Sequence, residues 1–261
     1  MAEVGDESDA FIPRFTHAFQ PIVDTIAGEI FSYEALIRGP AGESAQHVFT
    51  QVGADSLHSL HRLDRESRVA AVALAGGLRI ACHLNINMLP RSVLSPDVEL
   101  RNLLEVAERS HVSPDRLIVE VTEGEMIDDH AHFADVIDGY REVGIQIAID
   151  DFGAGHSGLN LLADLQPDMI KLDMNLVRGI ESRGPRQSIT RAIATVCCDL
   201  GIDVVAEGVE TLEEFAWLEH EGVRLFQGYL FAEPGFESLP LARYPHQLTT
   251  PLATVRPFTG D

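Results

Sequence analysis

At Ile145-Gln146-Ile147-Ala148-Ile149-Asp150-Asp151 a short apolar run ends in two adjacent carboxylates. A second such run, Met169-Ile170-Lys171-Leu172-Asp173, follows and contains the only lysine of a chain that otherwise uses arginine. Short runs rich in β-branched residues are typical of strands buried on both faces. Adjacent carboxylates in a confined site repel each other unless a cation or a proton separates them. The two runs therefore predict buried strands that end at a metal site with a lysine beside it.

Similar runs recur along the chain, and most are separated by stretches with helical periodicity. We expect strands at about 15–23, 30–38, 80–86, 117–122, 145–150, 169–172, 204–206 and 223–226. We expect helices at about 55–74, 98–110, 130–143, 185–200 and 211–221.

The connection 24–29 is too short for a crossover helix, so the first two strands are expected to pair antiparallel. Eight strands with intervening helices predict an α/β fold, a (β/α)8 TIM-like barrel with one antiparallel strand near the start. A doubly wound open sheet is the alternative. Residues 13–245 are expected to form the barrel, between a flexible N-terminal segment, 1–12, and a C-terminal tail, 246–261.

Composition narrows the possible functions. The 261 residues carry a formal net charge of −22, which argues against a general DNA-binding or anionic membrane surface. The first ten residues are acidic and lack the basic region of a secretory signal. Three cysteines, Cys82, Cys197 and Cys198, form neither a disulfide framework nor a zinc motif, so we expect a cytoplasmic protein.

Polar side chains lie in or directly after the expected strands, where barrel enzymes carry their chemistry. They are Glu34, Arg38, Asn85, Glu120, Glu123, Asp150, Asp151, Lys171, Asp173, Glu207, Glu210 and Gln227. Carboxylates and an amide, without histidine or cysteine, suit hard divalent ions such as Mg²⁺ or Mn²⁺. Shared carboxylates indicate two ions.

Each motif taken alone has a simpler interpretation. Asp150-Asp151-Phe152-Gly153 is typical of a turn that follows a strand, and Glu207-Gly208-Val209-Glu210 is typical of a helix N-terminus. Lys171 alone would be a salt-bridge partner. The joint occurrence of these residues at corresponding strand ends favours a functional site.

In this order the motifs resemble the EAL-domain cyclic di-GMP phosphodiesterase family, over about residues 19–231. They are Gln20-Pro21-Ile22-Val23, Glu34-Ala35-Leu36 continuing to Arg38, Asn85, Glu120-Val121-Thr122-Glu123, Asp150-Asp151-Phe152-Gly153, Lys171-Leu172-Asp173, Glu207-Gly208-Val209-Glu210 and Gln227-Gly228-Tyr229. The resemblance implies hydrolysis of cyclic di-GMP to linear pGpG with two Mg²⁺ or Mn²⁺ ions per site.

The resemblance also implies a role for each residue. One ion would be held by Glu34, Asn85, Glu120 and Asp150, and the other by Asp150, Asp151 and Glu207. Lys171 would contact the attacking water or the phosphate, and either Lys171 or Glu207 would handle the proton of that water. Glu210 and Gln227 would support the metal–water network, and Glu123 would anchor the loop after Asp150-Asp151-Phe152-Gly153. The ligand would contact Gln20, Leu36 and Arg38.

The chain departs from the family pattern at four positions. Asn87 stands where serine is common, and Ala154, His156 and Gly158 replace common residues of the loop after Gly153. These departures leave the expected metal ligands unchanged.

A homodimer and a sensor or regulatory partner domain are expected. The alternatives to an enzyme are a non-catalytic cyclic di-GMP receptor and a protein-interaction module.

Overall fold

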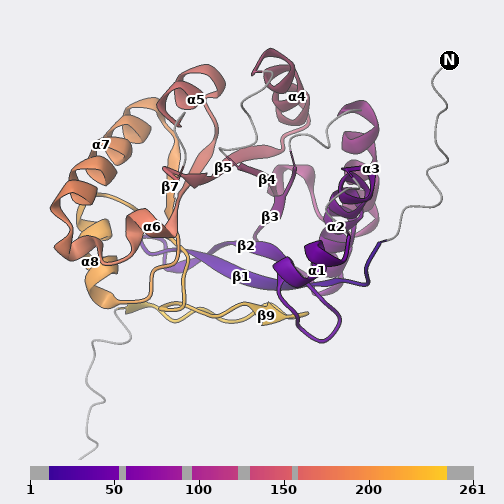
Figure 1. Ribbon diagram of the computed structural model, residues 1–261, viewed down its shortest axis with the longest axis horizontal. Coiled ribbons are helices and arrows are strands. Elements are labelled where there is room, and N and C mark those ends of the chain that lie inside the picture. The colour runs from indigo at the N-terminus through magenta and orange to yellow at the C-terminus, as the bar shows by residue number, and fades with distance from the viewer. Residues whose placement is uncertain (1–11, 53–56, 90–95, 123–129, 155–157, 246–261) are drawn as a thin grey trace, which may run out of the picture.

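The computed structural model describes residues 12–52, 57–89, 96–122, 130–154 and 158–245, with the backbone alone at 57, 96–97, 130–135 and 158–160. These residues form an α/β barrel in which most strands are followed by helices (Figure 1). The strands are β1 (Thr16–Asp24), β2 (Glu29–Arg38), β3 (His83–Asn87), β4 (Leu117–Thr122), β5 (Gln146–Phe152), β6 (Met169–Leu172), β7 (Asp203–Ala206), β8 (Leu225–Phe226) and β9 (Gly235–Phe236). The helices are α1 (Ala45–Gln51), α2 (Leu57–Gly77), α3 (Pro96–Arg109), α4 (His130–Glu142), α5 (Gly158–Leu165), α6 (Met174–Val177), α7 (Gly184–Leu200) and α8 (Leu212–His220), with 3-10 turns at Pro114–Arg116 and Ile180–Ser182.

The strand order closes the sheet on itself. Strands β2 to β8 are parallel, each to the next, and β1 pairs antiparallel with both β2 and β8. A tight turn joins β1 to β2, and Gly28 takes a positive φ of 71° in it. The predicted barrel with one reversed strand near the start is therefore confirmed. Strand β9 pairs with the first half of β1 and extends the wall where the two-residue β8 has ended.

Successive side chains of a strand point to opposite faces of the sheet, so the strands contribute to two separate apolar regions. The larger core lies between the sheet and the surrounding helices. A smaller cluster fills the barrel interior, where one residue from each of six strands meets the others. Its members are Ile22, Ile118, Ala148, Met169, Val205 and Leu225. This layer forms the floor beneath the polar residues described below.

The strands and helices predicted from the sequence are present, with shifted ends. Strand β3 begins at His83 instead of residue 80, because Ile80 still belongs to the turn that ends α2 and donates to the carbonyl of Ala75 (3.1 Å). Helices α1, α5 and α6 and strand β9 were not predicted. The two-residue β9 is too short to give a periodic pattern, and α1 has only seven residues.

The ends of the chain fall mostly outside the described part. The expected N-terminal segment, 1–12, is described only at Ile12, and the expected tail, 246–261, is not described. None of the described helices has the combination of length and apolar character that crossing a membrane requires.

Candidate functional site

A polar layer lies directly above the apolar floor, because side chains two residues apart point to the same face of a strand. Gln20, Glu120, Asp150, Lys171, Glu207 and Gln227 each lie two residues from a member of the floor. Strand β1 runs in the opposite direction, so Gln20 precedes its floor residue whereas the others follow theirs. Six strands thus each place one polar side chain at the same end of the barrel, either within the strand or, for Glu207 and Gln227, directly after it. This is the catalytic end in this architecture.

Lys171 lies at the centre of this layer and is fully buried. Its Nζ atom lies 2.7 Å from Oε1 of Glu207, 3.0 Å from Oε2 of Glu120, and 3.2 Å from carboxylate oxygens of both Glu34 and Asp150. Four carboxylates thus share one ammonium group. Even with Lys171 charged, the fully ionised cluster would carry three uncompensated negative charges, which favours the binding of further cations or protons.

Asp150 and Asp151 are brought to the same site by an irregularity in β5. Neighbouring strand residues normally point to opposite faces, but the pairing of β5 with β6 shifts register between Ile149 and Phe152. Asp151 also has a positive φ of 54°, which is uncommon for a residue with a side chain. As a result, oxygens of Asp150, Asp151 and Glu207 all lie within 4.8 Å of one another.

Two amides complete the layer. Asn85 donates from Nδ2 to Oε1 of Glu120 (2.7 Å), whereas its own Oδ1 is buried without a hydrogen-bond partner. Gln227 donates from Nε2 to Oε2 of Glu34 (2.7 Å) and to Oε1 of Gln20 (3.5 Å). A buried amide oxygen without a donor is costly, so Oδ1 of Asn85 is suited to a cation.

Burial and mutual repulsion shift the ionisation of the cluster. Burial, together with the nearby carboxylates Asp150 and Glu34, raises the pKa of Glu207 to about 8. Burial and the charge of Glu34 also raise the pKa of Glu120. Burial opposes the charge on Lys171, but the surrounding carboxylates outweigh it and raise the pKa of the ammonium above its usual value. Lys171 therefore stays charged, whereas Glu207 and Glu120 hold a proton more readily than ordinary glutamates.

The donor atoms suit hard divalent cations. Oxygens of Glu34, Glu120 and Asp150 form one group within 4.8 Å of one another, and Asp150 also belongs to the second group with Asp151 and Glu207. Both groups consist of carboxylate oxygens, which Mg²⁺, Mn²⁺ and Ca²⁺ prefer. Shared use of Asp150 matches the arrangement expected for two neighbouring ions.

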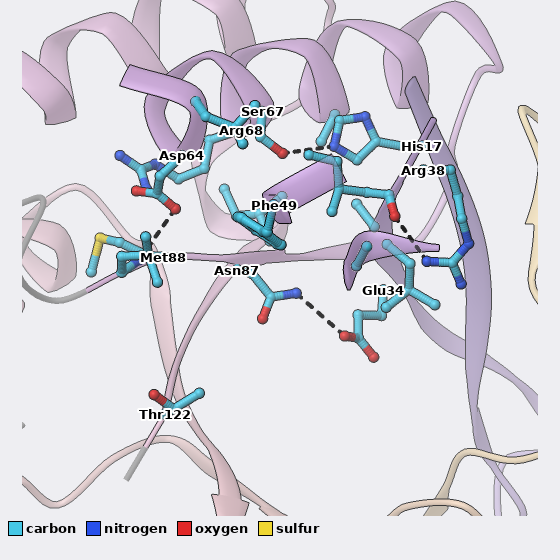
Figure 2. Close-up of a pocket in the computed structure, with 18 residues that line it drawn as sticks. His17, Glu34, Arg38, Phe49, Asp64, Ser67, Arg68, Asn87, Met88 and Thr122 are labelled. Atoms are coloured by element: carbon cyan, nitrogen blue, oxygen red, sulfur yellow. Dashed lines mark hydrogen bonds and ion pairs between the residues drawn. The ribbon is translucent and has the colours of Figure 1, made fainter. Parts of the chain in front are cut away.

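Two cavities open onto this cluster. One, of about 300 Å³, is lined by residues that include Gln20, Glu34, Asp151, Glu207 and Gln227. The other, also of about 300 Å³, is mostly apolar and extends from Glu34 towards α1 and α2 (Figure 2). Leu36 and Arg38, expected to contact ligand, line this second cavity. An elongated ligand could therefore lie across the carboxylates with parts in both cavities.

Other predicted residues lie at the edge of the cluster or outside the described structure. Glu210 lines the first cavity, but its carboxylate is paired with Arg178 (Nη2 to Oε1, 2.7 Å). Glu123 and His156 lie outside the described residues. Arg178 was not singled out from the sequence, because its partner lies 32 positions away.

The profile of the EAL domain matches residues 8–234. The chain belongs to the EAL domain family. Among curated relatives it is 36% identical over 231 residues to the blue light- and temperature-regulated antirepressor BluF of Escherichia coli K12, covering 88% of this chain and 57% of BluF. It is 34% identical over 225 residues to the cyclic di-GMP phosphodiesterase PdeR of the same strain, covering 83% of this chain and 33% of PdeR. The chain thus spans a third to somewhat over half of the length of these two relatives.

Solved EAL structures share the fold. A standalone EAL protein from Vibrio cholerae O395 in its c-di-GMP-bound form has a TM-score of 0.83 and 43% identity, covering 89% of this chain and 97% of that one. BlrP1 of Klebsiella pneumoniae, in a manganese and cyclic di-GMP complex, has a TM-score of 0.82 and 40% identity, covering 93% of this chain and 60% of BlrP1.

Proposed function

We propose that this EAL domain is a cytoplasmic phosphodiesterase that hydrolyses cyclic di-GMP to linear pGpG. The observation that carries the proposal is the complete cluster of four buried or nearly buried carboxylates around Lys171, with the unpartnered Oδ1 of Asn85 beside it. The proposal is also supported by the similarity to PdeR, which is named a cyclic di-GMP phosphodiesterase. Related structures that contain cyclic di-GMP with manganese or calcium support it as well.

In this proposal two Mg²⁺ or Mn²⁺ ions bind the cluster. Glu34, Asn85, Glu120 and Asp150 would hold one ion, and Asp150, Asp151 and Glu207 would hold the other. When bound, such ions activate a water molecule and neutralise charge that develops on the phosphate.

The side chains have separate tasks. Lys171, held by four carboxylates, would donate to the attacking water or the phosphate and keep its positive charge there. Gln227 would orient Glu34, and Glu210 and Glu123 would support the site from its edge. Gln20, Leu36 and Arg38 would contact the nucleotide. The reaction adds water across one phosphodiester bond, so the product carries a phosphate at one end and a hydroxyl at the other.

The relation to BluF favours a second candidate function. That relative is named an antirepressor, and the chain covers 57% of it. A non-catalytic cyclic di-GMP receptor, or a module that binds a protein partner, is therefore the alternative. A sensor or regulatory partner domain fits either function.

The proposed homodimer has a suitable surface on α7. Ile189, Val196 and Leu200 are exposed by 51%, 37% and 45%, and they lie on one face of this helix. Val196→Glu should shift the mass in solution from dimer to monomer, measured by light scattering. A wild-type protein that is monomeric at high concentration would exclude this dimer.

The deciding experiment is incubation of the chain with cyclic di-GMP and Mg²⁺, Mn²⁺ or Ca²⁺, followed by separation of the products. We expect pGpG with Mg²⁺ or Mn²⁺ and inhibition by Ca²⁺. Glu34→Ala and Lys171→Ala should form no pGpG while circular dichroism shows a retained fold. Tight nucleotide binding without turnover in the presence of Mn²⁺ would favour the receptor, and no nucleotide binding would favour the interaction module.

A further inference from the structure

Asn87 is not among the expected metal ligands, but its side chain contacts one of them. It ends β3 and donates from Nδ2 to Oε1 of Glu34 (3.3 Å), as Figure 2 shows. Asn85 lies on the same face of β3 and donates instead to Glu120 on the other neighbouring strand. Each asparagine of β3 thus orients the glutamate of one adjacent strand.

We propose that Asn87 is a positioning residue that, with Gln227, fixes the carboxylate plane of Glu34 for metal binding. The proposal rests on the proposed function. Asn87 holds Oε1 of Glu34, and Gln227 holds Oε2 at 2.7 Å. Glu34 is 6% exposed, and within the described residues these amides and Lys171 are its hydrogen-bonding or ion-pair partners.

The two amides matter because the last torsion of a glutamate is soft. Rotation about this bond has no sharp staggered minima, so hydrogen bonds set the orientation of the carboxylate. Lys171 cannot fix the orientation alone, since it contacts only Oε2 of Glu34 and is shared with three other carboxylates. Without Asn87, Oε1 of Glu34 loses its donor and the carboxylate is free to turn.

Serine could not take this role. In asparagine the donor nitrogen lies two bonds from Cβ, whereas the serine hydroxyl oxygen lies one bond from Cβ. The contact of Asn87 with Glu34 is already long for a hydrogen bond, at 3.3 Å, so the shorter serine side chain would not reach Glu34 from the same backbone position. The two-amide arrangement is therefore a property of this chain, at a position where the family pattern commonly has serine.

Asn87 lines the apolar cavity but not the first cavity, whereas Glu34 lines both. The side chain of Asn87 is exposed and lines the apolar cavity beside Met88 and Thr122, while its amide points to Glu34 (Figure 2). Its position at the edge of the cluster makes it replaceable without opening the buried core. A substitution at Asn87 therefore tests orientation of Glu34 more cleanly than one at a buried residue.

The test compares Asn87→Ala and Asn87→Ser with a control, Asn102→Ala, which makes the same chemical change on α3 away from the cluster. Mn²⁺ affinity is measured without nucleotide, from the electron paramagnetic resonance signal of free Mn²⁺. Loss of a residue that orients a metal ligand typically costs 10- to 100-fold in metal affinity. We expect a loss in this range for both Asn87 variants, with unchanged melting temperature, and wild-type affinity for Asn102→Ala. Mn²⁺ affinity within twofold of wild type in Asn87→Ala would overturn the proposal.

A double-mutant cycle separates positioning from a general structural effect. Asn87 and Gln227 act on the same carboxylate, so the losses in Mn²⁺ affinity for Asn87→Ala and Gln227→Ala should be non-additive. Additive losses would contradict the shared action on Glu34. If wild-type protein binds Mn²⁺ but forms no pGpG, the proposed function fails, whereas the affinity measurements still decide the role of Asn87.

Discussion

The Nζ atom of Lys171 lies 2.7 Å from Oε1 of Glu207, the shortest of four contacts that this ammonium makes with carboxylates. The two residues come from neighbouring strands, since β6 and β7 pair in parallel and Lys171 is opposite Val205. Glu207 comes directly after the last residue of β7, and its side chain points towards Lys171. The contact links the fixed cation to the carboxylate whose pKa is raised to about 8.

Replacement of Lys171 by alanine should make the protein more dependent on metal. The four carboxylates would lose their shared cation, so the metal-free variant should melt at a lower temperature than wild type. Added Mn²⁺ would replace the missing charge and should raise the melting temperature more in Lys171→Ala than in wild type. Scanning fluorimetry with EDTA or Mn²⁺ measures both values. An equal Mn²⁺-induced rise in the two proteins would show that Lys171 does not compensate the cluster.

Asn85→Asp tests the unpartnered amide oxygen. The exchange keeps the size of the side chain but adds another carboxylate, next to Glu120, and removes the donor to it. We expect lower stability in EDTA, because repulsion rises, and a larger stabilisation by Mn²⁺, because a charged oxygen replaces a neutral one. Chemical unfolding at several Mn²⁺ concentrations measures this difference. Stability in EDTA equal to that of wild type would contradict the assigned contact with Glu120.

For much of the site, the direction of the side chains can be predicted from the alternation of side chains along each strand. Once Met169 and Ala148 are placed in the barrel interior, Lys171 and Asp150 must point the same way. The position of Asp151 could not be predicted in this way, because it depends on a register shift and a positive φ that no local pattern encodes. The contact of Asn87 with Glu34 joins residues 53 positions apart and depends on the barrel register.

A buried cluster of ion pairs between α2 and α3 shows the same limit of prediction from the sequence. Asp64 and Arg68 are four residues apart on a helix, so their ion pair could be predicted from the sequence. Glu99, the second carboxylate on Arg68, lies on α3 and could be found only from the packing of the two helices. Asp64 also accepts from the backbone N–H of Leu89 (3.2 Å), directly beyond the strand that carries Asn85 and Asn87.

Arg68→Met should therefore destabilise the fold strongly. It leaves the carboxylates of Asp64 and Glu99 buried without their cation, which typically costs about 3–5 kcal/mol. The matched control is Arg109→Met, which breaks an exposed pair with Glu105 and should cost less than about 1 kcal/mol. Urea unfolding monitored by circular dichroism gives both free energies. Similar losses in the two variants would mean that the buried cluster contributes no more than a surface pair.

His17 should make stability depend on pH in the acidic range. It is 2% exposed, and burial, with a smaller effect of the Arg38 charge, lowers its pKa from 6.5 to about 4. Between these values the unfolded chain binds a proton that the folded chain does not, so stability is fully present above about pH 6.5 and falls as the pH drops towards 4. A shift of this size corresponds to about 3 kcal/mol.

His17→Phe should remove this contribution while keeping a buried ring next to Phe15. The variant loses the hydrogen bond between Nε2 of His17 and Oγ of Ser67 (3.0 Å), so it should be less stable than wild type at pH 7. Its free energy of unfolding should nevertheless fall less than that of wild type between pH 7 and pH 4, since no proton uptake at this position favours the unfolded chain. Carboxylates titrate in the same range in both proteins, so the measured quantity is the difference between the two pH profiles from urea unfolding. Parallel profiles would show that His17 is protonated as readily in the folded protein as in the unfolded chain.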